Sequence, residues 1–334
     1  MHKNSFQKIL ITGAFGMLGR EVLKQVLKKF PNAKVFATDV SFPSENLGLP
    51  RRFVLHNDTK KNCVFQILDI TKKEELENFF SKNQIDLIFH IAGVVSYNLS
   101  DAKKMFDVNI DGTKNLCEVA ERFGVKKIVY ASSVSAVKIL DGKISTEKDT
   151  PDEEDELLNN YSKSKLLAEK EFFSLKSEKL EKIAVNFGVI VGESKNFESV
   201  KNFVRKFFIL PKLQTFNSFV SVEDSADAMI FLAENGKNFE RYVVSTENFR
   251  NGDFLKLFAE NLGIKKVFIP VPKVFLRFFK KIILFFFKFG IIRNDAWKTM
   301  DVDKKFSSQK IFELGWKPKS SVEESVVKIC RENF

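Results

Sequence analysis

The sequence is poor in cysteine. Its 334 residues include three cysteines, Cys63, Cys117 and Cys330. They are odd in number, lie far apart and show no Cys-x-x-Cys spacing, so we expect reduced, partly buried thiols and neither a disulfide framework nor a metal site.

The sequence also lacks long uncharged apolar runs. No window approaches the eighteen or so residues that a membrane-spanning helix needs. Apolar residues make up 44% and charged residues 29%, a globular balance. Residues 1–8 contain no apolar stretch, so no secretory signal is predicted and we expect a cytoplasmic protein. No internal repeat or low-complexity tract is present.

No aromatic-basic recognition motif accompanies the net charge of +11. That charge suits an anionic cofactor or a membrane surface, and we predict no nucleic-acid partner. The length of the chain predicts one cofactor domain and one smaller lobe.

What the sequence does have is a glycine motif between a strand and a helix. Ile9 to Thr12 run directly into Gly13, and after Gly16 the apolar residues follow helical spacing. Gly13 and Gly16 would let the backbone approach a pyrophosphate, and Gly19 would let the helix pack on its strand. The spacing Gly-x-x-Gly-x-x-Gly therefore indicates a dinucleotide site.

A second feature supports this site. The next apolar run, from Val35, ends in Asp39, about twenty residues after the last glycine, where a carboxylate accepts hydrogen bonds from an adenosine ribose 2′-hydroxyl. Asp39 would repel a 2′-phosphate, so we predict NAD over NADP. Arg51 and Arg52 are interpreted as part of a solvated loop.

Strands and helices alternate along the chain that follows. Further strands are expected at 64–68, 86–93 and 127–131, with helices opened by a capping box at Thr71 and Glu74 and over 101–123. This alternation predicts an α/β fold with a doubly wound parallel sheet of Rossmann type. Ligands bind beyond the carboxyl ends of such strands, where the sequence places Gly13, Asp39, Asp69, Gly93 and Ser133.

Tyr161 and Lys165 are four residues apart, hence on one face of a predicted helix. A phenol can act as acid and base near neutrality when an ammonium group and a cationic nicotinamide stabilise its anion. A Tyr and a Lys at this spacing often mark a solvated face. Ser133, at the ligand-binding edge, could polarise an oxygen beside the phenol, which favours a Ser-Tyr-Lys set for hydride transfer.

Several motifs occur together in order. They are Thr12-Gly13-x-x-Gly16-x-x-Gly19, Asp39, Asp69-Ile70, His90-Ile91-Ala92-Gly93, Asn109-x-x-Gly112-Thr113, Tyr130-Ala131-Ser132-Ser133, Tyr161-x-x-x-Lys165 and Phe219-Val220-x-Val222-x-Asp224. With them, nearly the whole chain resembles the extended short-chain dehydrogenase/reductases of the NAD-dependent epimerase/dehydratase superfamily.

The resemblance implies roles for individual residues. Tyr161 would be the catalytic acid/base, Lys165 its partner and Ser133 the group that positions the substrate oxygen. NAD would contact Gly13, Phe15, Gly16, Met17, Gly19, Asp39, Asp69, Ile70, Ala92, Gly93, Asn109, Tyr161 and Lys165. It also implies a mainly NAD-binding domain over 1–192 and a mainly substrate-binding lobe over 193–334, from which about 219–246 returns to the sheet. Members are often homodimers.

Departures from the family pattern narrow the reaction. After the sixth strand, sugar-nucleotide members resemble Arg-Pro-x-Asn-x-Tyr-Gly, and this chain has Val189 in place of their phosphate-binding Asn. Before the Phe-Val-x-Val-x-Asp motif those members tend to have Arg-Asp, and this chain has Asn217-Ser218. Dehydratases carry an acidic pair where Val134 and Ser135 stand. The tail, through Leu314-Gly315-Trp316-x-Pro318, is more similar to the dihydroflavonol reductase and 3β-hydroxysteroid dehydrogenase branch.

Two reactions remain open after these departures. The first interconverts a ketone and a secondary alcohol on a small apolar substrate; the alternative is sugar-nucleotide epimerisation on tightly bound NAD. A redox-inert cofactor-binding protein is disfavoured, because Ser133, Tyr161 and Lys165 are all present.

An amphipathic helix is predicted over 271–290, opened by Pro272 and closed by Gly290. Basic residues gather on one side and phenylalanine, isoleucine and leucine cover most of the rest. Such a helix could lie in a membrane interface. The alternative, which we favour, is that its aromatic face packs over the substrate pocket. Near the end of the chain, Gly315 should stop one helix, and Ser321 with Glu324 should cap another.

Overall fold

The structure is a computed structural model that describes residues 6–42, 62–288 and 290–331. Arg51 and Arg52 lie outside the described residues.

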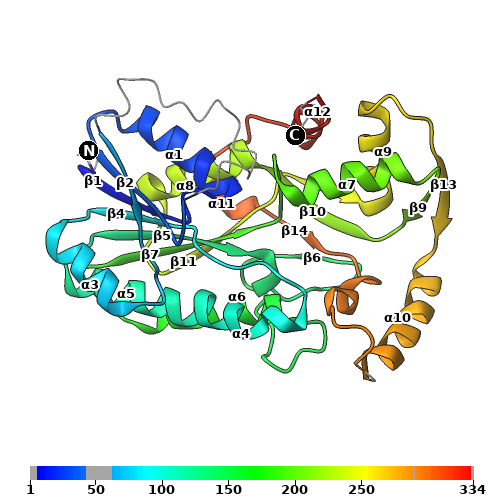
Figure 1. Ribbon diagram of the computed structural model, residues 1–334, viewed down its shortest axis with the longest axis horizontal. Helices are drawn as coiled ribbons and strands as arrows, with labels where there is room; N and C mark the ends of the chain where they lie inside the picture. Colours follow the sequence, from blue (N-terminus) through cyan, green and yellow to red (C-terminus); the bar gives the residue numbers. More distant parts are fainter. Residues whose placement is uncertain (1–5, 43–61, 289, 332–334) are drawn as a thin grey trace.

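The core of the molecule is a sheet of seven parallel strands in the order β11-β7-β5-β4-β1-β2-β3 (Figure 1). The predicted doubly wound parallel sheet is thereby confirmed. The strands are β1 (Lys8–Thr12), β2 (Lys34–Asp39), β3 (Cys63–Ile67), β4 (Leu87–His90), β5 (Lys127–Ser133), β7 (Glu181–Phe187) and β11 (Glu240–Val244).

Helices cover both faces of this sheet, as Figure 1 shows. On one face lie α1 (Met17–Lys29), α8 (Val222–Asn235) and α11 (Gln309–Glu313); on the other lie α3 (Lys73–Lys82), α5 (Gly112–Arg122) and α6 (Asn160–Ser174). Alternate strand residues feed the two layers, since Ile9 and Ile11 join one buried apolar cluster and Leu10 the other. The near-continuous apolar strands are thus explained by burial on both faces.

A smaller lobe lies beyond the carboxyl ends of the strands. It contains one sheet of β8 (Val189–Val191), β10 (Phe216–Ser221) and β12 (Glu247–Arg250), and another of β9 (Ile209–Leu213) and β13 (Val267–Val271). Its core includes Phe197, Phe219, Phe254 and Phe258. The helices α7 (Lys195–Lys206), α9 (Asn251–Asn261) and α12 (Val322–Arg331) surround that core.

Two short strands, β6 (Ile144–Ser145) and β14 (Lys305–Phe306), pair with each other. Within 219–246, α8 and β11 lie with the large sheet, whereas β10 pairs with β8 and β12 of the lobe. The division of the chain into two domains at about residue 192 stays a prediction.

The expected helix over 101–123 forms, with a π-helical turn inside it. A 3₁₀ turn (Leu99–Asp101), α4 (Ala102–Phe106) and a π-helical turn (Asp107–Asp111) precede α5. A π-turn inserts one residue into the helical ladder and is frequently found at functional sites. This turn contains Asn109, one of the residues predicted to support the cofactor pocket.

Of the two predicted capping boxes, one forms. The Ser321 amide donates to Glu324 (3.0 Å) and the Glu324 amide donates to the Ser321 hydroxyl (3.1 Å). The box at Thr71 was a wrong prediction, because the Thr71 hydroxyl donates to the Asp69 carboxylate (2.7 Å) and α3 begins only after Lys72. Asp69, two residues upstream, competes successfully for that hydroxyl.

The helix over 271–290 forms as α10 (Lys273–Lys288). The favoured prediction, that its aromatic face packs over the substrate pocket, was wrong. Phe275, Phe278 and Phe285 are each more than half exposed, while Leu276 is buried. Lys273 and Lys280, from the basic side of the helix, turn toward the protein, where acidic side chains from other segments hold them, whereas Lys281 and Lys288 are exposed. Among the described helices, none is long and apolar enough to cross a membrane.

Candidate active site

Three glycines shape the loop between β1 and α1. Gly13 has a φ of +70°, and a Cβ there would lie 2.6 Å from the Ala92 nitrogen. A Cβ on Gly19 would lie 2.0 Å from the Gly13 oxygen. The fold therefore requires glycine at both positions.

Gly16 is different. Its φ is −68°, and the nearest atom to a Cβ there, the Gly13 oxygen, would be 3.4 Å away. The fold itself tolerates a side chain at this position. A glycine at 16 fits the space that a pyrophosphate needs in front of the helix.

The start of α1 is chemically suited to an anion. No side chain caps the helix, and its first turn, from Met17, contains no acidic residue. The backbone amides and the helix dipole there favour negative charge. Asp39 stands beside the loop, where its carboxylate accepts from the Phe15 amide (3.1 Å) and the Val40 amide (2.8 Å). The residues present therefore fit a dinucleotide: the start of α1 would hold its phosphates, and Asp39 would hold its ribose.

The segments after β3 and β4 extend this edge. Asp69 accepts from the Thr71 amide (3.0 Å), and Ile70 is buried against Gly112, where a Cβ would lie 2.7 Å from the Ile70 Cδ1. This contact explains the glycine in the Asn-x-x-Gly-Thr motif. Asp69 and Ile70 are placed at the carboxyl edge as the sequence predicts, and their contact with adenine stays a prediction.

Asn109 ties the loop after β4 to the catalytic helix. Its side chain accepts from the Val94 amide (2.7 Å) and donates to the Val94 carbonyl (3.0 Å) and the Ser164 hydroxyl (2.9 Å). A Cβ on Gly93 would lie 3.2 Å from the Asn109 Oδ1 and 3.4 Å from the Lys165 Nζ. The structure thus brings Ala92-Gly93, Asn109 and Lys165 together.

Tyr161 and Ser133 meet at the same edge. Tyr161 lies in the first turn of α6, whose amide at Ser162 is capped by Asn159 (2.8 Å), and Ser133 ends β5. The two hydroxyls are hydrogen-bonded and both residues are buried. Burial raises the pKa of Tyr161, and the hydrogen bond with Ser133 opposes that rise. The phenol is therefore held protonated beside a second hydroxyl, as a proton donor requires.

Lys165 is buried one turn after Tyr161. Its ammonium donates to the Ala131 carbonyl (3.0 Å) and the Tyr130 hydroxyl (3.2 Å). Burial lowers the pKa of Lys165 to about 8, opposed by the charge of Glu169. The lysine can thus change protonation close to neutral pH.

Sequence reasoning missed a buried polar network beneath this site. Glu169 accepts from Ser132 and Asn186 and forms an ion pair with Arg241 (3.0 Å), which enters from β11. Burial raises the pKa of Glu169, and the Arg241 guanidinium opposes that rise. Its position four residues after Lys165 was the one available signal, because the partners lie on distant strands.

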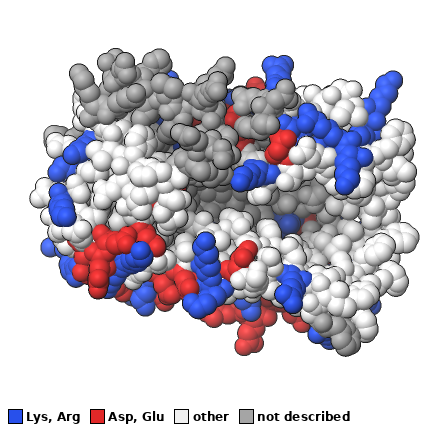
Figure 2. Space-filling view, viewed as in Figure 1, with Lys and Arg blue, Asp and Glu red and all other residues white. Residues whose placement is uncertain are grey.

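Tyr97 was also missed. Its ring meets that of Tyr161 edge-on, with centroids 6.0 Å apart. Burial raises the pKa of Tyr97, and the charge of Asp295 adds to the rise. Asp295, from the segment after α10, also accepts from the Asn160 amide (2.7 Å) at the start of α6. Residues of the lobe therefore reach the catalytic helix, and Figure 2 shows the surface hollowed between the two parts of the molecule.

A model of the NAD dependent epimerase/dehydratase family matches residues 9–245. The match covers both the glycine loop and the Ser133, Tyr161 and Lys165 positions. The chain belongs to this family. It is an NAD-dependent member of the extended short-chain dehydrogenase/reductases.

The relatives catalyse different reactions. A UDP-glucose 4-epimerase of Pisum sativum is 32% identical over 133 residues, which is 39% of this chain and 38% of that enzyme. A decarboxylating sterol-4-alpha-carboxylate 3-dehydrogenase of Schizosaccharomyces pombe is 27% identical over 235 residues, 68% of this chain and 64% of that enzyme. The match with the epimerase thus spans about two fifths of that protein.

Solved structures share the fold. A UDP-glucose 4-epimerase of Thermotoga maritima with UDP-glucose superposes with a TM-score of 0.73 at 20% identity, over 97% of each chain. At this identity the likeness concerns architecture, and it extends through the smaller lobe.

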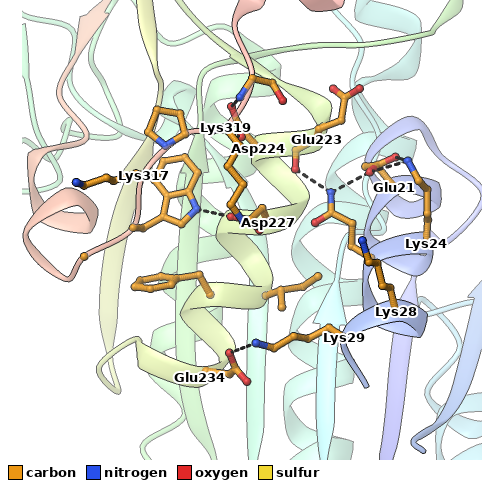
Figure 3. A pocket seen from close by; sticks show the side chains of 17 residues that line it. Glu21, Lys24, Lys28, Lys29, Glu223, Asp224, Asp227, Glu234, Lys317 and Lys319 are labelled. Carbon is orange, nitrogen blue, oxygen red and sulfur yellow. Dashed lines mark hydrogen bonds and ion pairs between the residues drawn. The ribbon is translucent and has the colours of Figure 1, made fainter. Parts of the chain in front are cut away.

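A separate groove lies between α1, α8 and residues 315–320, with a volume of about 820 Å³. Figure 3 shows its charged side chains pairing with one another, including Lys29 with Glu234 (3.0 Å). Trp316, from the Leu-Gly-Trp motif, donates to Asp227 (2.8 Å) and so ties the tail to α8. Ser133, Tyr161 and Lys165 do not line this groove.

Proposed function

We propose that this enzyme interconverts a ketone and a secondary alcohol on a small apolar substrate. NAD supplies the hydride acceptor or donor when bound. Tyr161 would move the proton at the substrate oxygen, Ser133 would hold that oxygen by hydrogen bonding, and Lys165 would stabilise the phenolate and hold the cofactor ribose. Asp39, with a single negative charge at the ribose position, supports NAD over NADP.

The apolar substrate rests on one observation: at two positions that bind phosphates in sugar-nucleotide relatives, this chain has Val189 and Asn217 in place of asparagine and arginine. Val189 packs against the apolar cluster of the lobe. Asn217 is half-buried, and its side-chain oxygen accepts from the Ser218 amide (3.2 Å). Neither residue offers a positive charge to a diphosphate.

Sugar-nucleotide epimerisation on tightly bound NAD is the second candidate. The similarity to UDP-glucose 4-epimerases over 133 to 166 residues of the chain favours it. An epimerase would use the same Ser133, Tyr161 and Lys165 to oxidise and then re-reduce one carbon.

Incubation of the purified enzyme with NAD and a panel of sterols, flavonoid-like alcohols and UDP-sugars distinguishes the two. The proposal predicts net NADH formation with an apolar secondary alcohol and no change in the UDP-sugars. Isomerisation of a UDP-sugar without net NADH would refute it and support the epimerase. A homodimer, the absence of a nucleic-acid partner and a cytoplasmic location stay predictions.

A further inference from the structure

Helix α10 is held with two of its lysines, Lys273 and Lys280, toward the protein. Lys273 pairs with Asp303 (2.9 Å) and Asp141 (3.1 Å), and Lys280 pairs with Asp301 (2.8 Å). Three acidic groups from two other segments thus fix the rotation of the helix about its axis. The opposite side of the helix is thereby directed away from the core.

That opposite side is a continuous exposed apolar surface, which we call the aromatic face. Phe278 is 60% exposed and Phe285 57%. Its members are the large exposed apolar residues on that side of α10: Val274, Phe275, Phe278, Phe279, Ile282, Phe285 and Phe286. Isolated exposed apolar residues are normal on a protein, but a contiguous set of this kind marks a surface that something covers.

Neighbouring elements add to this apolar end of the molecule. Strand β13 runs directly into α10 and pairs with β9, and Figure 1 shows β9, β13 and α10 at the same end. Exposed apolar side chains also occur at the end of α7 and on these two strands: Phe203, Phe207, Phe208, Ile209, Val267 and Ile269.

The charges around the aromatic face identify its partner. Residues 261–294 contain no aspartate or glutamate. Lys281 and Lys288 are exposed, and each lies three residues after a phenylalanine of the aromatic face, Phe278 and Phe285. If two copies met through this surface about a two-fold axis, these lysines would face one another with no acid in this segment to pair with them.

We propose that the aromatic face of α10 docks on a lipid bilayer that contains anionic lipids. The phenylalanines enter the interface while Lys281 and Lys288 contact the headgroups, the arrangement of an interfacial helix. Because the inward lysines are neutralised by Asp141, Asp301 and Asp303, the helix can turn its aromatic side outward without leaving the fold.

The docking surface is connected to the catalytic helix. Lys280 donates to the Lys298 carbonyl (2.7 Å), and Lys298 donates to the Leu158 carbonyl (2.9 Å), close to the start of α6. The bilayer would therefore lie beside the lobe segment that reaches Tyr161. Docking itself does not depend on which substrate the enzyme uses.

Co-sedimentation of the full chain with vesicles tests the proposal. The wild type should bind vesicles of phosphatidylcholine with phosphatidylserine and bind vesicles of phosphatidylcholine alone more weakly. Changing Phe278→Ser and Phe285→Ser together should weaken binding about a hundredfold, because two buried phenyl groups are lost. Changing Lys281→Glu and Lys288→Glu should weaken binding at least about tenfold and reduce its salt dependence.

The matched control changes Lys176→Glu and Lys179→Glu, two exposed lysines just before β7. It carries the same net charge as the Lys281 and Lys288 variant and should bind vesicles within about twofold of the wild type. Equal losses of vesicle binding in the two lysine variants would mean that net charge alone explains the binding, and this would overturn the proposal. The proposal would also be overturned if the wild type stayed in the supernatant, either as a monomer or as an oligomer that associates through Phe278 and Phe285. Melting temperature and NAD binding check that each variant folds; if the phenylalanine variant does not, the lysine pair and its control still decide.

Discussion

Substitutions at Gly13 and Gly16 should separate an effect on protein stability from an effect on NAD affinity. Gly13→Ala places a side chain at a φ of +70°, with its Cβ 2.6 Å from the Ala92 nitrogen. The left-handed conformation costs about 1–2 kcal/mol, and the overlap with backbone adds about 1–3 kcal/mol. The free energy of unfolding should therefore fall by roughly 2–5 kcal/mol even when no NAD is added.

Gly16→Ala should behave differently. Its φ of −68° suits alanine, and the 3.4 Å contact with the Gly13 oxygen is ordinary. Loss of glycine at an N-cap costs up to about 1 kcal/mol, and reduced freedom of the unfolded chain returns about 0.4–1 kcal/mol. Stability without NAD should thus stay within about 1 kcal/mol of the wild type.

NAD affinity is expected to fall in Gly16→Ala by at least about tenfold, or 1.4 kcal/mol, because the new methyl group occupies the pyrophosphate space. Urea unfolding without NAD and calorimetric titration with NAD measure the two effects. A Gly16→Ala variant that binds NAD as tightly as the wild type would refute the assignment of this loop to the phosphates. A Gly13→Ala variant as stable as the wild type would refute the geometric argument.

Three further outcomes follow from the site. The wild type should bind NAD more tightly than NADP, and NADP binding that is tenfold tighter would contradict the role of Asp39. Asp39→Asn removes the charge but keeps an oxygen for the Phe15 amide, so it should reduce the difference between the two affinities. Because burial lowers the pKa of Lys165 to about 8 from the 10.5 of a free lysine, turnover should fall as pH rises past 8. Over the same pH interval, the contribution of Lys165 to the free energy of unfolding should rise, because the unfolded chain then binds more protons than the folded chain. A Lys165→Met variant should lack that rise. Arg241→Met should lower the free energy of unfolding by about 3–5 kcal/mol, because it leaves Glu169 buried without its cation. The double variant Arg241→Met with Glu169→Gln should regain most of that loss. Additive losses in urea unfolding would argue against the ion pair between Arg241 and Glu169.

The sheet and the placement of the site were predictable because their signals are local. Apolar runs ending in Gly13, Asp39, Asp69 and Gly93 mark the carboxyl ends of parallel strands, and parallel strands bring those ends to one edge. The same reasoning brought Ser133 to that edge.

The features that could not be predicted from the sequence depend on contacts between distant segments. The helical spacing of 101–123 holds no signal for the π-turn at Asn109, which follows from the side chain's bonds to Val94 and Ser164. The buried pair of Glu169 and Arg241 joins α6 to β11, 72 residues apart in the numbering.

Helix α10 shows the limit most clearly. Its amphipathic pattern predicted the helix, and ordinary burial of apolar faces predicted the wrong orientation. The orientation is decided by Asp141, Asp301 and Asp303, whose pairing with Lys273 and Lys280 spans up to 132 residues of sequence.

The claim that Tyr161 is the proton donor is tested most directly by Tyr161→Phe, with Tyr97→Phe as the matched control. Tyr97 touches the same ring but is not assigned a proton-transfer role. With the alcohol or ketone that the wild type turns over, Tyr161→Phe should keep its affinity for NAD within about twofold and lose kcat by about a hundredfold to ten-thousandfold. The control should retain most of its kcat. A Tyr161→Phe enzyme with nearly full kcat would contradict the mechanism proposed for this site.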